Sequence, residues 1–149
     1  MKILAINRKA KWDFEIYKKY IAGVNLFGSE VKATREGKMN LKDSFCLFKK
    51  KELFLINTHI GQYSKSNENI PPYRERKLLL QKKELEEIKR ELNQKNLIII
   101  PLKAFDKNGW IKLEIGLARK KKKKEKKEIL KQKAIEREIN QELKNHRAR

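Results

Sequence analysis

Basic and amide side chains gather at four places in this chain, and their chemistry suits phosphate. Arginine and asparagine donate directed hydrogen bonds to phosphate and ribose hydroxyl groups, whereas lysine supplies a compact point charge. In chain order the groups are Asn7, Arg8 and Lys9; Lys32, Arg35, Lys38 and Asn40; Arg74, Arg76 and Lys77; and Lys112. Because these groups flank predicted strands, where barrel proteins bind oligonucleotides, we expect an RNA-binding surface.

Four aromatic residues lie among these basic groups and could stack on bases: Trp12, Tyr63, Tyr73 and Trp110. Both tryptophans fall at predicted strand positions, so packing in the core or at its rim is an equally good interpretation for them.

Signatures of catalysis are missing from the sequence. It contains no glycine-rich phosphate loop, no HExxH and no GxSxG. Asp13, Glu30, Asp43 and Asp106 could in principle gather around a metal for nuclease chemistry, but acids scattered through a basic chain are more often partners of Lys and Arg. Two distant histidines and the single Cys46 make a zinc site unfavourable. We therefore expect a protein without catalytic residues, metal or cofactor.

The charge balance points to a polyanionic partner. Among 149 residues, 39 are Lys or Arg and 19 are Asp or Glu, which gives a net charge of +20. Residues 119–149 hold 14 basic and 5 acidic residues, a net of +9, and residues 1–118 carry the remaining +11. We therefore predict an RNA-binding domain over 1–118 and a basic C-terminal tail over 119–149.

Periodicity predicts a mostly β fold with flanking helices. A small antiparallel barrel like that of oligonucleotide-binding domains suits the pattern, because closure removes exposed strand edges. The expected elements are a strand over 12–26 that bends near Gly23, a helix from a Ser29 cap to Gly37, a hairpin over 44–60, a loop over 61–73, a helix over 81–95 ending at Asn96, a strand over 97–102, an Asn108-Gly109 turn and a strand over 111–117.

The C-terminal tail combines a lysine run with a thin apolar stripe. From Arg119 to Lys127 only Glu125 is not basic, and like charges at helical spacing repel, so this run should be unstructured or poorly helical until it is neutralised. Ile135, Ile139 and Leu143 recur every four residues, which predicts a helix that forms against a partner.

A membrane partner fits the sequence poorly. The apolar stripe is too thin for an interfacial helix, and no apolar run reaches the roughly 18 residues of a membrane span. Met1 to Ile6 carries one short apolar patch without a small-residue cleavage site, so we expect a cytoplasmic protein.

Short motifs follow one another in a fixed order along nearly the whole chain. They are NRKA at 7–10, DFEI at 13–16, AG at 22–23, GSEVK at 28–32, REGK at 35–38, NLKDS at 40–44, RKLLL at 76–80, PL at 101–102, KNG at 107–109 and LEIGLA at 113–118. Their order and spacing resemble the SsrA-binding protein family, also called small protein B. Ile21 stands where that family usually has Glu before Ala-Gly.

The resemblance implies a six-stranded antiparallel barrel that binds the tRNA-like domain of transfer-messenger RNA and takes it to stalled ribosomes. It implies a tail that is disordered when free and helical in the decoding centre and mRNA channel. It also implies elongation factor Tu and alanyl-tRNA synthetase as partners through the RNA. The residues it adds to the candidate sites are Leu79 for RNA and Lys120, Lys121, Glu125, Lys126, Lys127 and Ile135 for the ribosome.

Composition and charge leave another function open. A general RNA-binding protein, or a ribosomal-type protein with a basic extension, would show the same net charge and the same basic tail.

Overall fold

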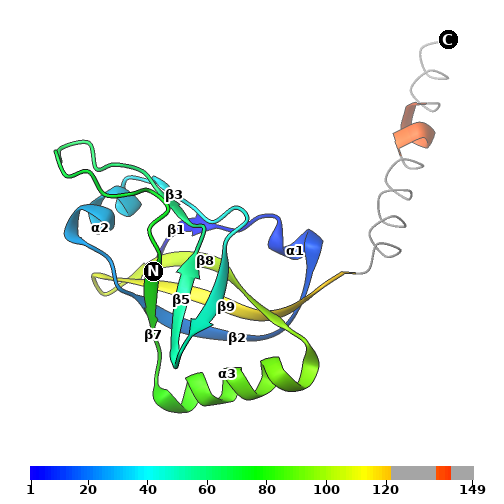
Figure 1. The fold of residues 1–149 in the computed structure, drawn as a ribbon. Coiled ribbons are helices and arrows are strands. Elements are labelled where there is room, and N and C mark those ends of the chain that lie inside the picture. The colour runs from blue at the N-terminus through cyan, green and yellow to red at the C-terminus, as the bar shows by residue number, and fades with distance from the viewer. Residues whose placement is uncertain (122–136, 142–149) are drawn as a thin grey trace, which may run out of the picture. The chain divides into compact units, whose positions relative to one another are not determined.

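Residues 1–121 and 137–141 are described by a computed structural model (Figure 1). The chain separates into two units, Met1–Arg119 and Lys120–Arg149. The first unit holds the sheet and helices discussed below. In the second unit, residues 137–141 are helical.

The elements of the first unit follow one another mostly as strands. In chain order they are β1 (Lys2–Ile6), α1 (Ala10–Asp13), β2 (Phe14–Val24), α2 (Gly28–Arg35), β3 (Met39–Asn40), β4 (Phe45–Lys49), β5 (Glu52–Ile56), β6 (His59–Ile60), β7 (Arg76–Leu79), α3 (Lys82–Lys95), β8 (Ile98–Lys107) and β9 (Trp110–Lys120). The expected mostly β fold with flanking helices is confirmed.

The main sheet closes on itself. Its strand order is β1-β8-β4-β5-β7-β2-β9, and β8 also pairs with β9. The strands from β8 through β4, β5, β7 and β2 to β9 therefore form a closed ring, to which β1 is added at β8. Closure leaves few unpaired backbone groups, as the prediction of a barrel-like fold required. A small separate sheet joins β3 to β6.

Strand β2 confirms the alternating pattern but begins later than predicted. Tyr20 and Ala22 are buried, while Ile21 between them is 48% exposed. Trp12 instead lies in α1, one helical turn whose Ala10 packs against Ile100 and Ala118. Over a stretch as short as one helical turn the apolar pattern does not distinguish a helix from a strand, so alternation alone could not locate the boundary.

Helix α2 begins one residue before the predicted cap. Phe27 occupies the N-cap position, and its backbone N–H donates to the Glu30 carboxylate at 3.0 Å. The prediction of Ser29 as the cap is wrong, because Ser29 lies inside the helix and its hydroxyl donates to Glu68 at 3.0 Å. Gly37 has φ +83°, the left-handed conformation expected after the helix.

Helix α3 matches its prediction closely. It ends at Asn96, whose φ of 51° is left-handed. Ile88 is fully buried, and Glu87 receives the Tyr20 hydroxyl at 3.0 Å and an ion pair from Lys18. These contacts fasten α3 across β2 (Figure 1).

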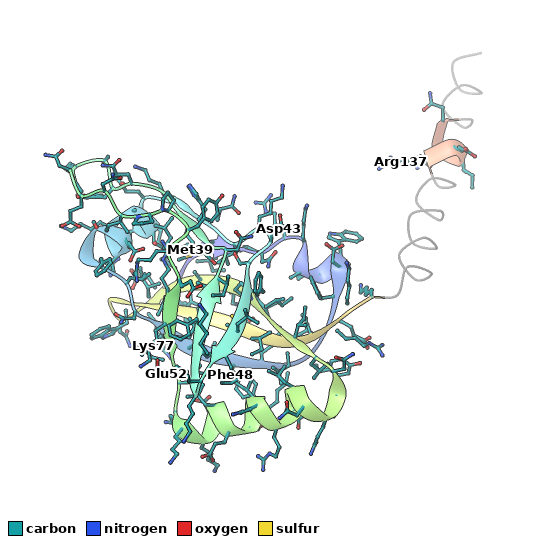
Figure 2. The ribbon with its side chains drawn as sticks, viewed as in Figure 1. Met39, Asp43, Phe48, Glu52, Lys77 and Arg137 are labelled. Atoms are coloured by element: carbon teal, nitrogen blue, oxygen red, sulfur yellow. The ribbon has the colours of Figure 1, made fainter. Side chains whose placement is uncertain are left out.

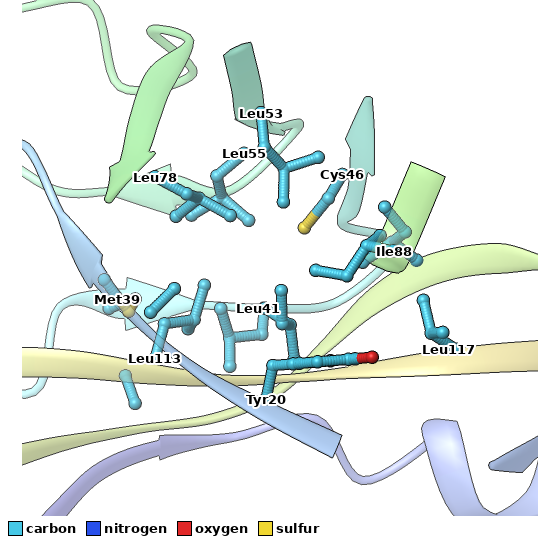
Figure 3. Close-up of a cluster of buried hydrophobic side chains, with 14 of the residues drawn as sticks. Tyr20, Met39, Leu41, Cys46, Leu53, Leu55, Leu78, Ile88, Leu113 and Leu117 are labelled. Atoms are coloured by element: carbon cyan, nitrogen blue, oxygen red, sulfur yellow. The ribbon is translucent and has the colours of Figure 1, made fainter. Parts of the chain in front are cut away.

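A single large core fills the ring (Figure 3). It is almost entirely aliphatic and draws on most strands and on α3. Its fully or nearly fully buried members include Leu41, Cys46, Leu53, Leu55, Leu78, Ile88, Leu113 and Leu117. Cys46 packs as a small apolar residue, as predicted, and burial raises the pKa of its thiol.

The β8–β9 hairpin is longer than its sequence pattern indicated. Asn108 and Gly109 have φ values of 52° and 82°, which confirms the predicted turn. Beyond the predicted end, Arg119 and Lys120 continue strand β9, and the Arg119 guanidinium donates to Glu15 at 2.8 Å. The prediction that these two residues are unstructured or poorly helical is wrong, because both belong to strand β9 and the ion pair holds Arg119.

In the parts of the chain that the structure describes, no helix is long and apolar enough to cross a membrane.

Substituting Gly109 tests the hairpin turn. Gly109→Ala should lower the free energy of unfolding by about 1 kcal/mol, because an L side chain is strained at φ +82°. Gly28→Ala is the control, because its φ is not positive and an added Cβ would meet nothing within 4 Å. Urea denaturation of both variants measures the difference, and an equal effect of the two would contradict the turn assignment.

Candidate nucleic-acid interface

The end of β1 and the segment after β3 form an open surface pocket of about 350 Å³. We call it the N-terminal pocket, and it is lined by Ile6, Asn7, Arg8, Lys9, Asn40 and Lys42. The fold thus brings the first of the predicted groups beside Asn40, a member of the second group that lies 31 residues after Lys9. Lys42 was missing from the predicted set, although it lay inside the NLKDS motif.

The two asparagines of the N-terminal pocket hold its shape. The Asn7 side-chain amide donates to the Pro101 carbonyl at 2.9 Å and so ties the pocket to β8. The Asn40 side-chain oxygen accepts the backbone N–H of Lys42 at 2.9 Å. Both amides are therefore engaged by the protein, while Arg8 and Lys9 are exposed and available to a ligand.

Arg76 lies inside the protein and not at its surface. Its side chain has no exposed area, and its guanidinium donates to Glu30 at 2.7 and 2.9 Å. It also donates to the carbonyls of Thr58 at 2.6 Å and Pro72 at 3.0 Å. The prediction that Arg76 contacts RNA is wrong, because burial behind Glu30 leaves no donor for an external phosphate.

Arg74 is also committed largely to the protein. Its guanidinium forms an ion pair with Glu30 and lies over the Phe27 ring, 4.3 Å from the ring centroid. About a quarter of its side chain, 27%, stays exposed. Sequence reasoning could not separate Arg74 and Arg76 from surface cations, because their acidic partner Glu30 lies more than forty residues earlier.

Glu30 is charged within this arrangement. Burial raises the pKa of its carboxyl. The hydrogen bonds from Arg74, the Phe27 amide and Arg76 together outweigh this effect, so the pKa of Glu30 lies below the ordinary 4.5. A carboxylate with three such donors is a strong acceptor.

The basic side chains of α2 and the following turn contact the loops around them. The Lys32 ammonium lies 5.4 Å from the centroid of the Tyr63 ring. Arg35 donates to Asp106 at 3.1 Å and to the Gly109 carbonyl at 2.8 Å, and Lys38 donates to the Gln62 carbonyl at 2.7 Å. These basic side chains are partly exposed, and their contacts with the protein hold each of them in one direction. Such an arrangement suits recognition of phosphates at fixed positions.

A second exposed strip runs along β7 and β2. Leu79 is 52% exposed and pairs with Gly23, on the same face as Ile21. Lys77 lies beside it and is bound to Glu52 at 3.0 Å. The structure leaves this strip apolar with a basic edge. Lys112 lies apart from it, half-buried on β9.

The aromatic residues are mostly at the surface. Trp12 is 53% exposed, Tyr73 58% and Trp110 72%, so packing in the core is excluded for both tryptophans. Tyr73 meets His59 edge to face at a centroid distance of 5.1 Å. His59 is half-buried, as predicted.

Two of the four acidic residues considered for metal binding form ion pairs with arginines instead. Glu30 and Asp106 both bind arginines, as predicted. Within residues 1–121 and 137–141, no group of three or more His, Cys, Asp or Glu side chains is placed to hold a metal ion.

The structure describes little of the predicted ribosome-facing set. Lys120 is exposed at the end of β9, and Lys121 follows it. The other members, Glu125, Lys126, Lys127 and Ile135, lie outside the described residues, and their roles stay predictions.

Comparison with known proteins places this architecture in a family. The family model described as SmpB protein matches residues 4–145. The chain belongs to the SmpB protein family. The match runs through the N-terminal pocket, the Glu30 cluster and most of the basic tail, so the family relationship covers both predicted parts of the chain.

Individual relatives agree with this assignment. An SsrA-binding protein of Thermosipho africanus is 46% identical, over 99% of this chain and 100% of that protein. One of Prochlorococcus marinus is 45% identical, over 96% of this chain and 88% of that protein. A solved structure described as "tmRNA-SmpB: a journey to the center of the bacterial ribosome" matches with a TM-score of 0.68 and 43% identity, over 83% of this chain and 87% of that one.

Neutralising Glu30 tests the internal role assigned to Arg76. Glu30→Gln should lower the free energy of unfolding by about 3 to 5 kcal/mol at pH 7, because it leaves a buried guanidinium without its countercharge. Glu52→Gln, at an exposed ion pair, should cost at most about 1 kcal/mol. Urea denaturation gives both values.

The pH dependence supplies an independent check. Because the folded pKa of Glu30 is lowered, its contribution is complete above the unfolded pKa near 4.5 and is lost as the pH falls through the folded pKa. The difference between wild type and Glu30→Gln should therefore shrink below pH 4.5. A constant difference down to pH 3 would contradict the ion-pair assignment.

Proposed function

We propose that this chain binds the tRNA-like domain of transfer-messenger RNA and delivers it to stalled ribosomes for trans-translation. The observation that carries the proposal is the 43% identity to a chain described in a tmRNA-SmpB complex of the bacterial ribosome. The SsrA-binding proteins that match over nearly the full length support the same RNA ligand.

The N-terminal pocket supplies the chemistry for this ligand. Arg8, Lys9 and Lys42 converge there on a frame fixed by the Asn7 and Asn40 hydrogen bonds. Because the frame is fixed before binding, less conformational entropy is lost when phosphates are bound. Such an array distinguishes a folded RNA by the positions of its phosphates, without reading bases.

The directed cations of α2 extend this surface. Arg35 is held against the β8–β9 turn and Lys38 against the loop after β6, so neither can follow a phosphate far from its position. Together with Lys32 and Lys112, they favour an RNA with a defined three-dimensional shape over a flexible strand.

The protein acts by binding and not by catalysis, and it works in the cytoplasm with the ribosome. The tail that follows β9 enters the decoding centre and mRNA channel, where ribosomal RNA neutralises its lysines and a helix forms. Elongation factor Tu and alanyl-tRNA synthetase act on the same RNA, and the protein meets them through it.

Removing two cations from the N-terminal pocket tests the RNA assignment. Arg8→Gln with Lys42→Gln should weaken binding of a tRNA-like RNA about tenfold or more and make the slope of log K against log salt shallower by about 1.8. The control is Arg90→Gln with Lys83→Gln on α3, which removes the same two residue types outside the pocket. Fluorescence anisotropy over a salt series measures both.

Competition binding separates this function from general RNA binding. A tRNA-like RNA should displace the labelled RNA far better than unstructured RNA or a plain duplex does. Equal competition by all three RNAs would support a general RNA-binding or ribosomal-type protein instead.

Truncation tests the division of labour between body and tail. A chain ending after Lys121 keeps β9 and the Arg119–Glu15 ion pair intact. It should bind free tRNA-like RNA within about tenfold of the full chain, which corresponds to about 1.4 kcal/mol, and should fail to support peptide tagging on stalled ribosomes. Tagging at the normal level, or loss of specific RNA binding, would contradict the proposed division.

A further inference from the structure

A second basic pocket lies between the β4–β5 hairpin and α3. We call it the α3 pocket. It has a volume of about 280 Å³ and is lined by Phe48, Lys51, Lys82, Leu85, Glu86 and Lys89. Figure 2 shows Phe48 and Glu52 beside α3, whereas Met39 and Asp43, which flank the N-terminal pocket, lie away from it toward the other end of the sheet.

The α3 pocket is built by the regular geometry of two elements. Lys82, Leu85, Glu86 and Lys89 follow the spacing i, i+3, i+4 and i+7, so they lie along one face of α3. The facing hairpin is turned tightly by Lys50, which has φ 60°, and this turn brings Lys51 beside Phe48.

The cations of the α3 pocket are not occupied by the protein. Within the described ranges, no ion pair or side-chain hydrogen bond involves Lys51, Lys82 or Lys89, and all three are exposed. Neighbouring lysines on the same elements differ, since Lys49 is paired with Glu75 and Lys95 with Glu91. Three lysines against the single Glu86 leave the pocket with a net positive charge.

The floor of the α3 pocket is apolar. Phe48 and Leu85 are both half-buried, with part of each side chain open to the pocket. An aromatic floor beside unpaired cations is the arrangement that binds single-stranded nucleic acid, because bases or riboses pack on the apolar surface while phosphates lie at the cations.

We propose that the α3 pocket binds a single-stranded RNA segment. Its phosphates lie at Lys51, Lys82 and Lys89, and one base or ribose packs on Phe48 and Leu85. The protein therefore presents RNA-binding pockets at two separate places on the unit Met1–Arg119. This second contact does not depend on which RNA the N-terminal pocket binds.

The test follows the α3 pocket by NMR in the full-length chain. Titration with a ten-nucleotide single-stranded RNA of mixed sequence should shift the amide signals of Phe48 and Leu85 saturably. The pocket variant Lys82→Gln with Lys89→Gln should weaken the binding measured at these two signals about tenfold. The control variant Lys83→Gln with Arg90→Gln removes two charges from neighbouring positions of the same helix and should change it less than about twofold.

Three results would overturn the proposal. The first is a titration in which the Phe48 and Leu85 signals do not move while other signals do. The second is an equal loss in both double variants, which would indicate diffuse charge attraction. The third is that a ten-residue glutamate peptide shifts the two signals at lower concentration than the RNA does, which would indicate an acidic protein partner. Unchanged α3 signals in the unliganded variants show that the helix is intact.

Discussion

The buried carboxylate of Glu30 is the contact on which the functional surface depends. It caps α2 through the Phe27 amide, and it pairs with Arg74, just before β7, and with Arg76 on β7. Through Arg76 it reaches the carbonyls of Thr58 and Pro72. One charge cluster thus holds together α2, β7, the residue before β6 and the loop between β6 and β7. The ion pairs and hydrogen bonds of Glu30 with Arg74 and Arg76 offset the cost of removing these charges from water, while the buried Arg74 Nε has no hydrogen-bond partner within the described residues.

The cations of this protein divide into two kinds as a consequence. Arg74 and Arg76 stabilise the fold, whereas Lys32, Arg35 and Lys38 project from the α2 region that the Glu30 cluster holds in place. The net charge of +20 describes both kinds together and cannot distinguish them. A basic side chain can contact RNA only where its ion pair within the protein leaves part of that side chain exposed.

Closure of the sheet joins the elements that carry the surface. Because β8 pairs with both β4 and β9, most strands have a partner on each side and the core is enclosed (Figure 3). The Asn7 amide anchors the N-terminal pocket to the Pro101 carbonyl on β8, while α3 is fastened to β2 through Glu87. The two pockets are therefore built on separate parts of one compact unit, Met1–Arg119.

The sequence by itself determined the local features. The alternation of β2, the Asn108-Gly109 turn, the α3 face with its Asn96 end and the basic character of the chain all follow from neighbouring residues. The start of β2 and the extension of β9 did not, because Ala10 and Glu15 decide them through distant partners. The cap of α2 is a local contact between Phe27 and Glu30, three residues apart, which the choice of Ser29 overlooked. Only the tertiary structure showed that Arg76 is internal while Lys42 joins Asn7 and Arg8. The sequence specifies the chemistry of each side chain. The exposure of that side chain to solvent depends on which residues from distant parts of the chain pack against it.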